Sequence, residues 1–261
     1  ETLDNLGVVT STLGDPAAAI EYYRQSLQIR RAIYSGPHED LGQTLNNLAV
    51  AYYNLGDLDA AEALYLEALD NDRALFGDHH PTLATNMANL ARVYQDREEY
   101  GRAEELLLDA LRIRERALGA DHFETAISHS QLANLYGAMT RLAEAQQHHE
   151  EALRIRQQLL GTEHPTIGTT INGLAVIQLQ RGDYGAAEEG FRRAVEIYHA
   201  TLGAEHRFTG VALCNLATTL HRQGRLEEAE QTFRQGLAIL EATHDREHPE
   251  LAYNHTRYAA L

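Results

Sequence analysis

Apolar and polar positions recur along the chain with a fixed period. The stretch from Leu45 to Asp57 is followed by a second stretch from Ala63 to Leu69 and by a loop that ends at Pro81. Copies of Leu48 then follow at intervals of 42 residues: Leu90, Leu132, Leu174 and Leu216. A constant period of this kind is typical of repeat proteins, in which each repeat packs only on its neighbours.

Within one repeat the apolar residues have helical spacing. Leu45, Leu48 and Tyr52 fall on one helix face, and Tyr65 and Leu69 fall on a second one. Each helix is amphipathic, so stacked helix pairs are needed to complete the burial. We expect an all-α solenoid of six helix pairs plus a trailing helix, forming a single array of repeats at about residues 1–39, 40–81, 82–123, 124–165, 166–207, 208–249 and, in part, 250–261.

Small and large side chains alternate between the two helices of a repeat, which predicts closely packed helix axes. The Ala49 position also holds Gly7, Ala91, Ala133, Ala175, Ala217 and Ala259. The Ala61 position also holds Ala19, Ala103, Ala145, Ala187 and Ala229. The opposing large position holds Tyr23, Tyr65, Leu107, Phe191 and Phe233, with His149 as its one polar member.

Capping residues predict where the helices begin and end. In the first repeat, Asp15 and Pro16 are suited to start a second helix, which we expect to run to about Ile33. The turn between the two helices contains Gly56 in the second repeat. The third and fourth repeats have Glu98 and Thr140 in this turn, where glycine is expected.

Charge and composition narrow the range of partners. The 261 residues have a formal net charge of −16, which argues against nucleic acid or an anionic membrane as the partner. The chain has one cysteine, Cys214, so it has no internal disulfide; this fits a cytoplasmic location. No apolar run is long enough to span a bilayer. Both chain ends interrupt a repeat, so we expect a piece of a longer protein that carries other domains.

The order leucine, small residue and tyrosine, followed by small residue, aromatic residue and alanine, resembles the tetratricopeptide repeat. The loop from Leu160 to Pro165 and the stretch from Leu45 to Ala49 resemble the 42-residue variant found in kinesin light chains and in bacterial proteins. The resemblance implies a right-handed superhelix. It also implies that first helices line a groove in which polar residues, asparagine especially, hold an extended peptide.

Carried over to this sequence, the asparagine position holds Asn5, Asn47, Asn89 and Asn215. Gln131 and Gly173 interrupt this ladder, and Arg257 fills the position in the trailing helix. An amide can pair with any peptide unit because it is both donor and acceptor. The alternative is that these asparagines bond the backbone of the neighbouring repeat and serve the fold. The full predicted groove is Asn5, Asn46, Asn47, Tyr53, Asn54, Asn89, Arg92, Gln131, Asn134, Asn172, Asn215 and Arg222.

Histidines recur at one loop position: His38, His80, His122, His164, His206 and His248. Successive copies lie about 10 Å apart by the spacing of packed helices, too far to share a metal ion. We expect each of them to bond local backbone ahead of the next helix, and we expect no metal site and no cofactor.

No nucleotide-binding loop or nucleophile motif occurs, and Cys214 lies in an apolar run. We therefore expect no enzymatic activity. The first functional hypothesis is a module that binds an extended peptide or a partner helix in the groove. The second is a regulatory or sensor arm of a larger bacterial signalling protein, a serine/threonine kinase or a signal-transduction ATPase.

Overall fold

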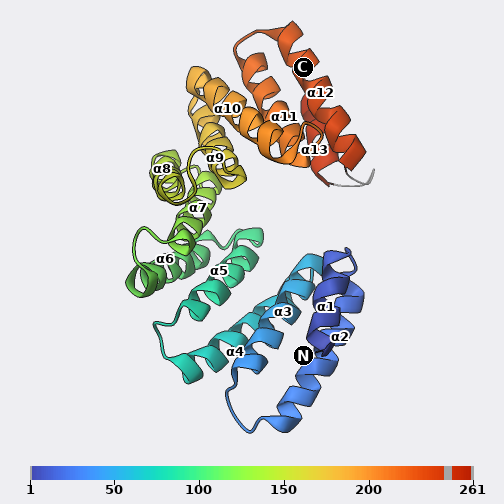
Figure 1. Ribbon diagram of the computed structural model, residues 1–261, viewed down its shortest axis with the longest axis vertical. Helices are drawn as coiled ribbons and strands as arrows, with labels where there is room; N and C mark the ends of the chain where they lie inside the picture. The colour runs from blue at the N-terminus through green and yellow to red at the C-terminus, as the bar shows by residue number, and fades with distance from the viewer. Residues whose placement is uncertain (1, 244–248, 260–261) are drawn as a thin grey trace. The chain divides into compact units, whose positions relative to one another are not determined.

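The computed structural model describes residues 2–243 and 249–259, which contain thirteen α-helices and no β-strand (Figure 1). The chain divides into two compact units, Glu1–Gln131 and Leu132–Leu261, and the boundary falls within one helix. The N-terminal unit holds α1 (Thr2–Thr12), α2 (Pro16–Ile33), α3 (Glu39–Leu55), α4 (Leu58–Phe76), α5 (Pro81–Asp96), α6 (Tyr100–Leu118) and the first half of α7 (Phe123–Ala138). The C-terminal unit holds the rest of α7, α8 (Leu142–Leu160), α9 (Pro165–Arg181), α10 (Tyr184–Leu202), α11 (Arg207–Arg222), α12 (Leu226–Thr243) and α13 (Pro249–Ala259).

Consecutive helices form pairs, and each pair packs on the next. In the N-terminal unit α1 packs on α2, α3 on α4 and α5 on α6, while α2–α3 and α4–α5 contacts join the pairs (Figure 1). In the C-terminal unit α9 packs on α10 and α11 on α12, and α10 contacts α11. The predicted pairing of helices is confirmed, and α2 begins at Pro16 and ends at Ile33 as expected.

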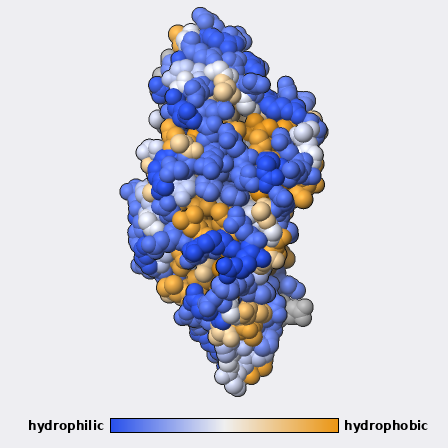
Figure 2. All heavy atoms as spheres, turned by 90° about the vertical axis from the view of Figure 1, so that its left-hand side faces the viewer, coloured by the Kyte–Doolittle hydropathy of each residue, from blue (hydrophilic) through white to orange (hydrophobic). Residues whose placement is uncertain are grey.

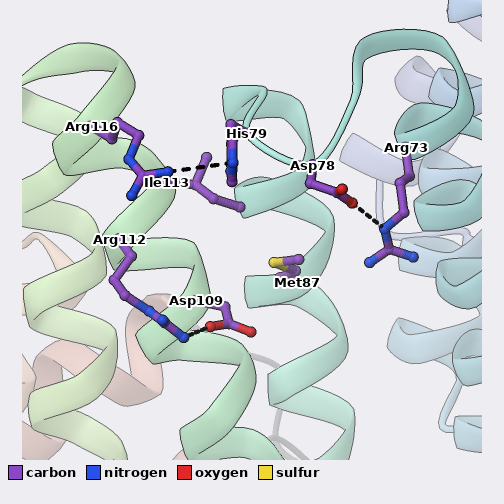
Figure 3. Close-up of a pocket in the computed structure, with 8 residues that line it drawn as sticks. All are labelled: Arg73, Asp78, His79, Met87, Asp109, Arg112, Ile113 and Arg116. Carbon is purple, nitrogen blue, oxygen red and sulfur yellow. Dashed lines mark hydrogen bonds and ion pairs between the residues drawn. The ribbon is translucent and has the colours of Figure 1, made fainter.

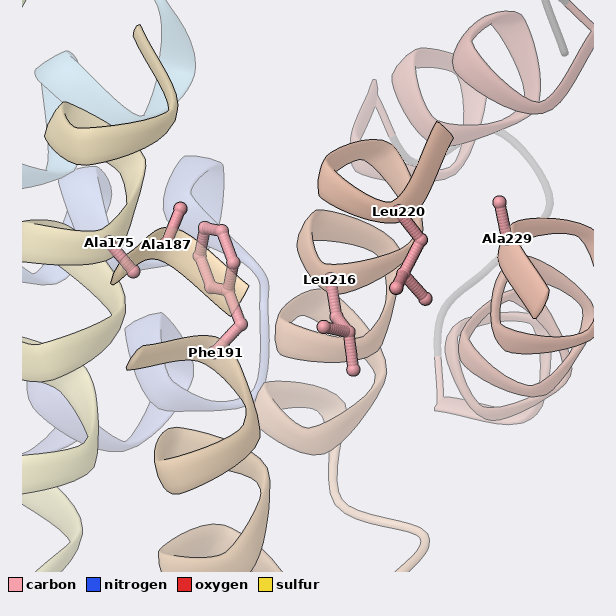
Figure 4. Packing of buried hydrophobic residues seen from close by; sticks show 6 residues of the cluster. All are labelled: Ala175, Ala187, Phe191, Leu216, Leu220 and Ala229. Carbon is pink, nitrogen blue, oxygen red and sulfur yellow. The ribbon is translucent and has the colours of Figure 1, made fainter. Parts of the chain in front are cut away.

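The predicted alternation of small and large side chains builds the core. In the C-terminal unit Phe191 packs with Ala175 and Ala187, and the same cluster includes Leu216 and Leu220 (Figure 4). All copies of the Ala61 position are fully buried, as are those of the Ala49 position from Ala49 to Ala217. Ala259, on the last described helix, is exposed.

The recurring loop histidines cap the helices that follow them. The imidazole Nδ1 of His164 accepts a hydrogen bond from the backbone N–H of Thr166 at 3.2 Å, ahead of α9. His38, His80, His122 and His206 make the same bond to the residue two positions later. The expectation of a local backbone bond is confirmed for these five, and His248 lies outside the described residues. Each imidazole satisfies one N–H that a helix start leaves without a partner.

Two of the turns between paired helices place an ordinary residue where the backbone favours glycine. Gly56 and Gly182 have φ of 87° and 83°, in the left-handed region. Glu98 and Thr140 occupy the equivalent turns with φ of 60° and 58°. Their side chains are disfavoured in this conformation, because Cβ comes close to the following carbonyl.

Hydrophilic residues cover most of the surface visible in Figure 2, and hydrophobic residues form several separate patches there. Within the described ranges, no helix is long and apolar enough to cross a membrane.

Candidate functional site

Two adjacent depressions lie in the N-terminal unit along α1, α3 and α5, the first helices of its repeats. The first, of about 450 Å3, lies between α1, α2 and α3 and brings Asn5 and Asn47 together. The second, of about 440 Å3, lies where α3 and α5 meet the ends of α4 and α6, and Asn46 lines it. Gln43 lines both, so the two are neighbours along α3. We call them together the first-helix groove.

A buried ion pair closes one side of the first depression. Arg30 Nη2 lies 2.8 Å from Asp4 Oδ2, and both side chains are about nine-tenths buried. The hydroxyls of Ser26 and Thr44 each donate to Asp4 at 2.8 Å. The charges are paired and hydrogen-bonded to each other, so they form a rigid polar wall.

The predicted asparagines divide into two kinds in the N-terminal unit. Asn89 Nδ2 donates to Asn46 Oδ1 at 3.0 Å, so these two amides link α5 to α3. Asn5 is exposed and Asn47 is half-buried, and both line the first depression. Asn46 and Asn89 therefore bond each other within the fold, whereas Asn5 and Asn47 face the groove. The alternative expected from the sequence is a bond to the backbone of the neighbouring repeat, but the bond of Asn89 joins two side chains.

Farther along the same helices, Tyr53 and Arg92 form a cation–π contact. The guanidinium carbon of Arg92 lies 4.6 Å from the centre of the Tyr53 ring. Burial and a hydrogen bond to Asp96 raise the pKa of Tyr53, so its hydroxyl stays protonated. Asn54 is exposed next to this pair, and the helix ends one residue later.

In the C-terminal unit a chain of polar bonds joins the first helices. Asn215 Nδ2 donates to Asn172 Oδ1 at 3.4 Å, and Arg257 Nη1 donates to Asn215 Oδ1 at 3.1 Å. Arg257 therefore fills the asparagine position of α13 by extending this chain. Asn134 on α7 and Arg222 at the end of α11 are exposed, outside these bonds.

The two interruptions of the ladder have different structural settings. Gln131 is half-buried, and its Oε1 atom has no hydrogen-bond partner among the described residues. At Gly173 a β-carbon would lie 2.7 Å from Cε1 of His149, so the ring of His149 takes the space that a side chain would need.

A recurring set of buried polar contacts was not foreseen from the sequence. The guanidinium of Arg30 reaches Thr44, Asp72 accepts from Asn86 at 2.7 Å, and Arg114 donates to Ser128 at 2.7 Å. Arg156 and Thr170 form a fourth pair. In each pair the two residues are 14 apart and join the end of a second helix to the next first helix. Charged residues recurring every 42 positions at Arg30, Asp72, Arg114 and Arg156 are the signal that would have revealed them.

A third cleft, of about 280 Å3, lies between α4, α5 and α6, with Met87 and Ile113 among its lining residues (Figure 3). It also contains several arginines, two of which are paired with carboxylates. Arg73 Nε lies 3.0 Å from Asp78 Oδ1, and Arg112 pairs with Asp109. Across the described ranges, no three His, Cys, Asp or Glu side chains are grouped so as to hold a metal ion.

Comparisons with known proteins agree with this architecture. The sequence pattern described as the tetratricopeptide repeat matches residues 1–74, 40–116, 85–158, 124–198 and 166–242. No curated protein matches the sequence. The crystal structure of BtubC (BKLC) from P. vanneervenii is similar in fold, with a TM-score of 0.74 and 23% identity over 88% of this chain and 92% of that one.

A putative kinesin light chain from Podosopora anserina, with nearly identical repeats, has a TM-score of 0.65 and 26% identity. This similarity covers 77% of the present chain and 95% of the other. The apo form of RapI has a TM-score of 0.68 and 17% identity, over 91% and 96% of the two chains. Proteins with tetratricopeptide repeats generally mediate protein–protein interaction and are typically not catalytic. The chain belongs to the tetratricopeptide repeat family, and its repeats are of the kinesin-light-chain type.

Proposed function

We propose that the protein binds an extended peptide of a partner protein along the first-helix groove of its N-terminal unit. The observation that carries the proposal is the placement of Asn5 and Asn47 in the first depression, with the amide of Gln43 shared between it and the second. Amides spaced along a groove suit a peptide backbone, because each can accept from an N–H and donate to a carbonyl.

The volume and lining of the two depressions also suit a peptide. Each depression has a volume of about 440–450 Å3, in the range of sites that take a few side chains. The first is lined by apolar Val8, Ile29 and Ile33 as well as by amides. An extended peptide directs alternate side chains to opposite sides, so it can place side chains in both depressions while its backbone meets the amides. The cytoplasmic location expected from the sequence stays a prediction.

The test separates amides that face the groove from amides that serve the fold. A library of random peptides is selected on the wild-type protein, and the retained peptides are measured by calorimetry. Replacing Asn5 and Asn47 by Ala should weaken binding by about tenfold or more, or about 1.4 kcal/mol, with the melting temperature unchanged. Asn54→Ala is the matched control, because Asn54 is exposed and lines neither depression.

Asn89→Ala should instead lower the melting temperature, because it removes the bond to Asn46. Peptides that bind equally well to the Asn5 and Asn47 variant would contradict the groove proposal. The absence of any selected peptide would contradict it too.

A further inference from the structure

Asp72 is a buried carboxylate whose two hydrogen bonds come from neutral amides. Asp72 is 2% exposed. Its Oδ1 atom accepts a hydrogen bond from Asn71 at 2.9 Å, and its Oδ2 atom accepts one from Asn86 at 2.7 Å. The chain contains no lysine, and no arginine of the described ranges pairs with Asp72. Burial raises its pKa, while the two amide hydrogen bonds oppose that effect. A buried charge without a counterion is costly to the fold.

The equivalent positions of the other repeats show that the fold does not require a carboxylate here. Forty-two residues earlier the position is Arg30, and in later repeats it holds Arg114, Arg156, Tyr198 and Leu240. All of these are buried. The charge is therefore reversed at one repeat only, in a position where an apolar residue also packs. Asp72 joins α4 to α5 through Asn86, and its charge, which no arginine of the described ranges pairs with, is open to a second role in binding.

Asp72 lines the second depression of the first-helix groove, and the backbone leaves room for it. A β-carbon at Gly42 would lie 2.2 Å from Asp72 Oδ1, so glycine at this point of α3 lets the carboxylate approach the helix. The side chains of Phe76, Pro81 and Leu118 supply apolar surface in the same depression. A carboxylate together with apolar surface suits a charged group on an aliphatic stem.

The other charges of this depression are Glu39, Glu124 and Arg114. Arg114 is held within the fold, since Nη2 lies 3.2 Å from Glu124 Oε2 and Nη1 donates to Ser128 at 2.7 Å. Arg114 and Glu124 offset each other, which leaves Asp72 and Glu39 as the net charge of the depression. The electrostatic balance therefore favours a cation.

We infer that the second depression takes a lysine or arginine side chain of the bound peptide, with its cationic group at Asp72 and its stem on Phe76, Pro81 and Leu118. The inference rests on the proposed function, because it assigns a specificity to the same groove. The bound cation would supply the counterion that Asp72 lacks.

The experiment starts with the peptides selected from the random library on the wild-type protein. We expect one peptide position to be enriched in Lys or Arg. Replacing that residue by norleucine or citrulline, which keep the stem and remove the charge, should weaken binding to the wild type by about tenfold. This comparison needs no protein variant.

Asp72→Asn should bind the charged peptide as weakly as the wild type binds its neutral analogue, and should bind the two peptides equally. Its melting temperature is measured as well, because asparagine keeps only one of the two acceptors that Asn71 and Asn86 use. Asp70→Asn is the matched control on the same helix, since Asp70 is exposed and pairs with Arg73.

The outcomes separate the two proposals. Selected peptides with no basic position, or an Asp72→Asn variant that still prefers the charged peptide, would overturn the assignment of Asp72 and leave groove binding in place. If the wild type selects no peptide at all, both proposals fail.

Discussion

The ring of His149 on α8 lies directly against Gly173 on α9. A β-carbon at residue 173 would come within 2.7 Å of Cε1 and 2.9 Å of Nε2 of His149. His149 is also the one polar residue at the position that Tyr65, Leu107 and Phe191 fill in other repeats. Glycine at residue 173 and histidine at residue 149 thus belong to one packing arrangement. The imidazole ring of His149 takes the space that the asparagine side chain of the ladder would need at residue 173.

The first prediction concerns this pair. Gly173→Ala should destabilise the protein by about 1–3 kcal/mol, because the new methyl group overlaps the His149 ring. In a His149→Ala background the same change should stabilise by up to about 1 kcal/mol, since alanine favours a helix over glycine. Urea denaturation of the four proteins in this double-mutant cycle measures the coupling. Equal effects of Gly173→Ala in both backgrounds would show that the contact carries no energy.

The second prediction concerns acid stability. Burial, together with the charges of Arg156 and His148, lowers the pKa of His149 to about 4. Between pH 6.5 and 4 the unfolded chain binds a proton at this residue and the folded chain does not. The contribution of neutral His149 to stability is therefore complete above about pH 6.5 and is lost as the pH falls toward 4, by up to about 1.4 kcal/mol per pH unit.

His149→Leu should remove this part of the pH dependence, because leucine fills the same position at Leu107 and does not titrate. Melting temperatures of the two proteins from pH 8 to 4 test it. His199→Leu, at an exposed histidine of α10, is the control and should leave the wild-type profile unchanged. Parallel profiles for the wild type and His149→Leu would contradict the prediction.

The third prediction concerns the two turns that lack glycine. Glu98→Gly and Thr140→Gly should each stabilise the protein by about 0.5–1 kcal/mol, because both residues hold a positive φ that glycine adopts freely. Gly182→Ala, at the same turn position with φ of 83°, should destabilise by a similar amount. Denaturant midpoints provide the measurement, and a loss of stability in Glu98→Gly would mean that its side chain contributes more than the backbone strain removes.

The fourth prediction concerns the imidazole caps. His164→Ala should destabilise by about 0.5–2 kcal/mol, since it removes the acceptor for the Thr166 N–H at the start of α9. His164→Asn should keep most of the stability, because asparagine is a good capping residue. Thermal unfolding followed by circular dichroism distinguishes the two variants. If Ala and Asn behave alike, the bond to Thr166 does not stabilise the helix.

Sequence patterns predicted the features that depend on neighbours at fixed spacing. The 42-residue period predicted the paired helices, the capping residues predicted the start and end of α2, and the small and large positions identified the core. The asparagine ladder was harder to interpret, because an amide such as Asn89 has the same appearance in the sequence whether it faces a ligand or bonds Asn46.

By itself, the sequence determined the repeat architecture, because helical periodicity, caps and small-residue positions act locally and recur in every copy. Only the tertiary structure decided which polar residues are available for binding. Residue pairs such as Asn46 and Asn89, or His149 and Gly173, come into contact through the packing of different helices. The same holds for the charge of Asp72, because its burial and its lack of a paired arginine in the described ranges arise only once the helices are stacked.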